Sequence, residues 1–101
     1  MKSKLLNAIL NIVCEVCEVS KEDVVSMRKS EYIVEARSIF VSVCRQYGLP
    51  SGSIARFLNR KRIQAVSEML GNYRIFSKQS YSFRLMSKEV DEKISAIYPR
   101  S

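Results

Sequence analysis

The sequence predicts an all-α fold, a compact arrangement of about five to six helices that contains a helix-turn-helix. Apolar residues recur at spacings of three and four along most of the chain, which is the period of an amphipathic helix. No stretch of useful length alternates between apolar and polar residues as a half-buried strand does. The 101 residues, 47% hydrophobic and 27% charged, suit one domain with one core over residues 1–101.

The first half of the chain predicts three helices. Residues 3–18 have apolar positions on one face and form the first. Ser20, three residues before Asp23, resembles an N-cap that opens a short second helix. Ser30 is placed to cap a longer third helix, and the Gly-Leu-Pro segment 48–50 ends it.

The second half predicts a helix-turn-helix and then a packing helix. A short helix ends at Leu58, Asn59–Arg60 make a turn, and residues 61–73 form the next helix. The polar stretch 76–82 is expected to be a looser joint. The final helix, 83–98, packs over the core through its apolar face.

The segment 51–73 carries the clearest indication of function. A short apolar helix, a basic turn and an amphipathic helix follow one another, as in proteins that place a recognition helix in the DNA major groove. The residues that can form the buried seam between the two helices are Ile54, Leu58, Val66, Leu70 and Tyr73. The cations that crowd the turn are Arg56, Arg60, Lys61 and Arg62. Guanidinium groups fit phosphate oxygens and the O6/N7 edge of guanine, although a charged turn can also be merely solvated.

The charge distribution also indicates a polyanionic partner. The formal net charge is +7, but residues 1–50 carry 7 cations and 6 acids, whereas residues 51–101 carry 10 cations and 4 acids. Such asymmetry is typical of a nucleic-acid-binding surface. A surface charged only for solubility is the alternative that composition leaves open.

The cysteines do not predict a disulfide or a metal site. Three of them (Cys14, Cys17, Cys44) form no even-numbered framework, so a reducing, cytoplasmic location is expected. Cys14-x-x-Cys17 has metal-ligand spacing, but the chain has no histidine and only one further cysteine to complete a tetrahedral site. These cysteines are expected to be packing residues.

Membrane and enzymatic functions find little support. The apolar run near the N-terminus is interrupted by Asn7 and Asn11 and followed by no small-residue cleavage site. No apolar stretch reaches the roughly 18–20 residues that span a bilayer. Without histidine, a general base would have to be a carboxylate or lysine with a shifted pKa, and the acidic pairs lie among other charges. We therefore expect no enzyme, small-molecule substrate or cofactor.

Two short motifs carry a resemblance to a known family. Ala36-Arg37 fits the alanine-arginine motif at the start of a long helix, and residues 54–58 (IARFL) fit an "IG..F" helix. With these motifs the chain resembles the C-terminal DNA-binding domain of the bacterial replication initiator DnaA, a Trp-repressor-like helix-turn-helix domain. The resemblance runs over about residues 9–73, and more loosely to Tyr98.

The resemblance implies particular DNA contacts. Lys29 falls where the family places a basic-loop arginine in the minor groove, and Arg45 where a lysine contacts phosphate. Residues 62–65 fall where the recognition helix meets bases and backbone. Together with the cations of the turn, the candidate DNA-binding residues are Lys29, Arg37, Arg45, Ser53, Arg56, Arg60, Lys61, Arg62, Ile63, Gln64 and Ala65.

The chain also departs from the family pattern. Asn59-Arg60-Lys61-Arg62-Ile63 replaces the family signature glycine-glycine-arginine-aspartate-histidine. Glu31 and Glu35 stand where the family is usually cationic. A base preference different from the family's origin sequence is therefore expected. No glycine-rich phosphate loop accompanies the motif, so the resemblance does not imply an initiator ATPase.

The sequence thus predicts a double-stranded DNA-binding domain with a replication-related or regulatory role, and a replication or regulatory protein is a further candidate partner. The alternative is a protein–protein interaction module on the same fold that has lost DNA binding. Glu31 and Glu35 favour this alternative. The late aromatics could serve such a partner, although packing of the last helix is the preferred interpretation; they are Tyr73, Phe76, Tyr81, Phe83 and Tyr98.

Overall fold

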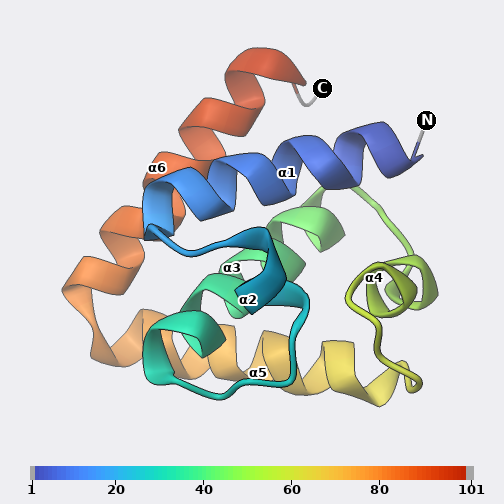
Figure 1. Cartoon of the computed structure of the whole chain (residues 1–101). Helices are drawn as coiled ribbons and strands as arrows, with labels where there is room; N and C mark the ends of the chain where they lie inside the picture. The colour runs from blue at the N-terminus through green and yellow to red at the C-terminus, as the bar shows by residue number, and fades with distance from the viewer. Residues whose placement is uncertain (1, 100–101) are drawn as a thin grey trace.

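The computed structural model describes residues 2–99, and all of its regular structure in this range is helical (Figure 1). The helices are α1 (Lys2–Cys17), α2 (Lys21–Val25), α3 (Glu31–Gln46), α4 (Ser51–Phe57), α5 (Gln64–Gln79) and α6 (Tyr81–Ile97). The predicted all-α class is confirmed. None of these helices, within the described part of the chain, is long and apolar enough to cross a membrane.

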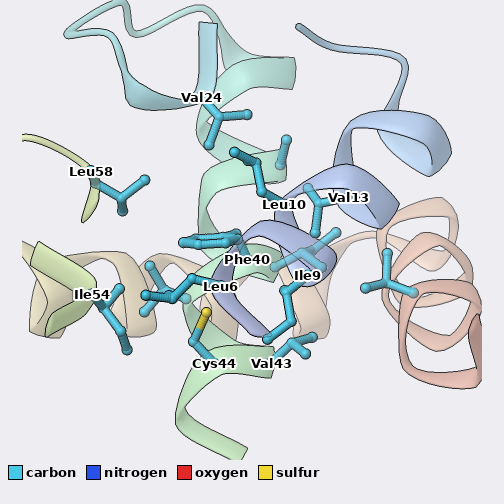
Figure 2. Packing of buried hydrophobic residues seen from close by; sticks show 14 of the residues in the cluster. Leu6, Ile9, Leu10, Val13, Val24, Phe40, Val43, Cys44, Ile54 and Leu58 are labelled. Atoms are coloured by element: carbon cyan, nitrogen blue, oxygen red, sulfur yellow. The ribbon is translucent and has the colours of Figure 1, made fainter. Parts of the chain in front are cut away.

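Helix α3 is the centre of the fold. Every residue from Ala36 to Cys44 is buried, so this helix is covered on all sides rather than along one stripe. It lies between α1 and α5 in Figure 1, and it also packs against α2, α4 and α6. The side chains of Leu6 and Ile9 from α1 approach Phe40 of α3 in Figure 2. Phe40 also stacks on Phe57, with ring centroids 5.7 Å apart, which fixes α4 to the central helix.

Several helix ends follow capping rules. Glu18, Gly48 and Asn59 have positive φ values of 56°, 79° and 58°, and each lies just past the end of a helix. This left-handed position closes a helix by returning the following N–H to a carbonyl of its last turn. Ser20 caps α2 as predicted, since its hydroxyl accepts a hydrogen bond from the Asp23 amide at 3.0 Å. Ser30 occupies the N-cap position of α3, but its side chain makes no capping hydrogen bond.

The predicted limits of the helix after the turn are wrong at both ends. It begins at Gln64 rather than near Lys61, and it continues to Gln79 rather than ending near Tyr73. The expected loose joint over 76–82 is reduced to Ser80, whose hydroxyl accepts a hydrogen bond from the Phe83 amide at 3.1 Å and so opens α6 at once. Residues 60–63 offer no Ser, Thr, Asp or Asn to cap an earlier start.

The seam between α4 and α5 is mostly as predicted. Ile54, Leu58 and Val66 are fully buried, but Leu70 is only partly buried and Met69 takes the inner position.

At the other end of α5, aromatic side chains of α5 and α6 pack against one another. The Phe83 ring is fully buried and lies 5.4 Å from the Tyr73 ring and 5.3 Å from the Phe76 ring.

Candidate nucleic-acid interface

The turn between α4 and α5 is built by the left-handed residue Asn59. The Asn59 amide donates to the Arg56 carbonyl at 3.0 Å, and the Arg60 amide donates to the Ala55 carbonyl at 2.8 Å. These two bonds end α4 as a Schellman motif does. The chain then reverses, and the side chains of Lys61 and Arg62 remain exposed.

The start of α5 presents the residues that a recognition helix would use. Ile63 holds the N-cap position, and the Val66 amide donates to its carbonyl at 2.9 Å. Gln64 is exposed and Ala65 is partly buried. The Ile63 side chain is 56% exposed, but its Cδ1 lies 3.9 Å from where a Cβ on Gly52 would stand. Ile63 therefore rests partly against α4 while leaving more than half of its surface free.

A second basic element lies beside α5. The segment Met27–Ser30, which we term the basic loop, connects α2 to α3 and runs next to α5 in Figure 1. Lys29 is exposed there, whereas Arg28 is paired with the Asp23 carboxylate at 3.1 Å. Lys29 is thus an exposed, unpaired cation of this loop among the described residues, and its contact with DNA stays a prediction.

A cleft of about 350 Å³ joins the basic loop to α5. Met27 and Lys29 line it from the loop, and Ala65, Glu68 and Asn72 line it from α5. Two elements that are more than 30 residues apart in the sequence therefore face the same space. A single rigid surface can then contact two neighbouring parts of one ligand.

Glu68 and Asn72 were not among the predicted site residues. They follow Gln64 at spacings of four, so the three side chains share one stripe of α5. This spacing is the sequence signal that could have identified them. Both bring polar groups to the cleft beside Lys29, and the Glu68 carboxylate can accept hydrogen bonds but repel phosphate.

Arg37 was predicted to contact DNA, which requires an exposed side chain, but the structure buries it. Only 4% of its surface is exposed, and its Nε donates to the Val24 carbonyl at 2.8 Å. Burial, and secondarily the charge of Arg60, lowers the pKa of Arg37. The guanidinium of Arg60 is also occupied, because it donates to the carbonyl of Leu58 at 2.7 Å. Burial lowers the pKa of Arg60 as well. We do not retain either residue as a DNA contact.

The remaining predicted residues surround α4. Arg45 is exposed near the end of α3, and its Nη1 donates to the Leu49 carbonyl at 2.9 Å, which holds the turn into α4. Ser53 is partly buried in the first turn of α4, and Arg56 is exposed in its last turn. Arg45 and Arg56 therefore keep cationic side chains in solvent, whereas Ser53 offers only part of its surface.

The cysteines show no sign of activation. Burial raises the pKa of Cys17 to about 12 and also raises the pKa of Cys14. Cys44 is fully buried in the core, and burial raises its pKa further above the ordinary range. A thiol with a raised pKa is a poor nucleophile and metal ligand at neutral pH. This environment agrees with a packing role.

The sequence of this site lies within a known family pattern. The model of the family described as "Bacterial dnaA protein helix-turn-helix" matches residues 6–70. The chain belongs to this family. The match runs from α1 into α5, so it includes the basic loop, the turn and the start of α5. Membership supports a DNA-binding domain, and the family is not one of enzyme domains. A search of individual curated proteins gives no match.

Proposed function

We propose that this chain binds double-stranded DNA with the start of α5 in the major groove and with the basic loop on the flanking backbone or in the minor groove. Its role would be replication-related or regulatory targeting to particular DNA sites. The proposal extends the family's general DNA-binding character to a specific orientation on the duplex.

The observation that carries this orientation is the shared cleft. Lys29 from the basic loop and Ala65 from the first turn of α5 line the same space, so both elements can meet one duplex at the same time. The positive end of the α5 dipole also lies at Gln64, next to the exposed cations Lys61 and Arg62. A helix N-terminus and neighbouring cations together attract phosphate groups.

Each exposed residue has a role that follows from its chemistry. Arg62 can donate to guanine O6 and N7, and Gln64 can pair with adenine through its amide. Ile63 can touch a thymine methyl with its free surface. Phosphate contacts are assigned to the exposed cations Lys29, Arg45, Arg56 and Lys61.

A nuclear magnetic resonance titration would test the orientation. We expect a random duplex, added to ¹⁵N-labelled protein in low salt, to shift the amide signals of Lys29, Arg62 and Gln64. Signals of Lys88 and Lys93, which are exposed cations on α6, serve as the control and should not move. Shifts concentrated on α6 instead would contradict the proposed orientation.

The protein–protein interaction module stays as a second candidate because of one surface feature. Tyr81 and Leu85 of α6 and Ile75 of α5 are exposed apolar side chains, with Tyr81 68% exposed. Tyr81 and Leu85 are four positions apart and share one face of α6, and exposed apolar faces are typical of interaction sites. Under this hypothesis the protein would not bind duplex DNA even in low salt, and Tyr81→Ala would weaken binding to the protein partner.

A further inference from the structure

The C-terminal end of α2 is held by arginine side chains from elsewhere in the chain. The last carbonyls of a helix have no partner within the helix and need donors from outside. Arg37 supplies three such bonds: its Nε donates to Val24 at 2.8 Å, and its Nη2 donates to Asp23 and Ser26 at 3.0 Å each. The end of α2, directly before the basic loop, is thereby tied to α3.

Arg60 reaches the same end of α2 from the turn before α5. Its Nη1 donates to the Val25 carbonyl at 3.2 Å, and its Nη2 donates to the Ser26 carbonyl at 2.8 Å. The same guanidinium also donates to Leu58 of its own turn at 2.7 Å. One side chain therefore bridges the helix-turn-helix and the residue directly before the basic loop, across 34 positions of sequence.

The two guanidinium groups meet at the Ser26 carbonyl, which accepts from both. Two cations side by side repel, so this arrangement persists only because carbonyl oxygens surround them. Hydrogen bonds from charged donors are stronger than those between neutral groups, so these bonds can hold the loop in place.

We propose that Arg60 is a positioning residue that holds the basic loop in register with the start of α5, so that the DNA contact of Lys29 depends on it. This inference rests on the proposed function. Lys29 lies three residues beyond Ser26 and lines the cleft together with Arg60 and Ala65. Loss of the bridge would free the loop and separate the two DNA-contacting elements.

A double-mutant cycle in duplex binding tests the inference. In the otherwise unchanged protein, Lys29→Ala should weaken binding roughly tenfold, as for one lost charged hydrogen bond. In an Arg60→Ala background the same change should weaken binding less than about twofold, because the loop is already misplaced. Lys61→Ala, an exposed neighbour, is the matched control and should leave the tenfold effect of Lys29→Ala intact.

The conservative variant separates positioning from direct phosphate contact. Arg60→Lys keeps the charge but loses the fork that reaches several carbonyls. A positioning role predicts that Arg60→Lys behaves like Arg60→Ala. The inference is overturned if Lys restores binding, or if the effects of Lys29→Ala and Arg60→Ala simply multiply.

A measurement without DNA distinguishes failure of this inference from failure of the proposed function. The Arg28 amide donates to the Ser26 hydroxyl at 3.2 Å, so its hydrogen exchange reports the order of the loop. We expect exchange at Arg28 to be at least about fivefold faster in Arg60→Lys, and unchanged in Lys61→Ala. Unchanged exchange in Arg60→Lys would overturn the inference, whether or not the protein binds DNA.

Discussion

At the scale of single residues, Arg62 most clearly separates this chain from its family pattern. The family signature has an aspartate at this position, and an aspartate accepts hydrogen bonds, as from cytosine N4. Arginine can only donate, and guanine O6 and N7 are its best partners. Because Arg62 is exposed directly before α5, this reversal should alter which base is preferred.

Replacing Arg62 with Asp should therefore change the base preference and not only the affinity. We expect sites selected by the unaltered protein from a random duplex library to contain a guanine that is worth about 1–3 kcal/mol of discrimination, and we expect Arg62→Asp to lose it. The remote variant Lys88→Asp should weaken binding little and keep the same preference. If the unaltered protein selects the family's own box and Arg62→Asp keeps that choice, Arg62 serves only as a phosphate anchor.

Glu35 provides a residue-scale prediction about pH. Burial, and secondarily the charge of Glu31, raises the pKa of Glu35. A carboxyl group with a raised pKa favours folding while it is protonated, and this stabilisation is lost as the pH rises through its pKa in the folded state. Glu35→Gln should thus be more stable than the unaltered protein at pH 7, and the difference should disappear in acid. Urea unfolding at several pH values measures this, and a Glu35→Gln variant that is less stable at pH 7 would refute it.

At the scale of helices, the sequence predicted which helices are present better than it predicted where each helix begins and ends. The start of α2 was predicted because Ser20 and Asp23 form a local capping pair. The start of α5 was missed because Ile63 gives no capping signal, and its end was missed because Phe76 packs against Phe83 from the next helix. Local sequence patterns do not contain such contacts between helices.

In the candidate site, too, local features could be predicted from the sequence, whereas contacts between distant residues could not. Exposure of Lys61 and Arg62 could be predicted from residue type and position in the turn. The orientations of Arg37 and Arg60 could not, because all but one of their partner carbonyls lie 11–35 residues away in the sequence, the exception being Leu58 beside Arg60. Their positive charges led to the prediction of DNA contacts. In the structure, their side chains donate hydrogen bonds to the carbonyls at the end of α2, which have no partner within the helix.

The seam of the helix-turn-helix offers a matched pair of leucine substitutions. Leu58 is fully buried, whereas Leu70 is partly exposed. Leu58→Ala should lower the free energy of unfolding by about 2–5 kcal/mol because it leaves a cavity. Leu70→Ala should lower it by less, about 1–2 kcal/mol, because less area leaves the core. Denaturant unfolding followed by circular dichroism compares the two, and equal losses would mean that the rotation of α5 about its axis is wrong.

At the scale of the whole molecule, the ion pair between α1 and α6 lies away from the turn before α5. The ammonium of Lys93 lies 3.5 Å from the Glu15 carboxylate and 3.9 Å from that of Glu89, at the contact of α1 and α6. In Figure 1 this contact lies across the molecule from the turn before α5. Lys61 and Arg62 of that turn are exposed and make no ion pair in the described residues 2–99. The turn before α5 therefore keeps two cations available for a polyanion.

The most direct test of DNA binding is a salt titration of affinity for a random duplex. Each phosphate that a cation neutralises contributes about −0.9 to the slope of log K against log salt concentration. The exposed cations assigned to the duplex are Lys29, Arg45, Arg56, Lys61 and Arg62. The account predicts measurable binding in low salt with a slope of roughly −3 to −5. Absence of binding in low salt, or a slope near zero, would contradict the assignment of this surface to DNA.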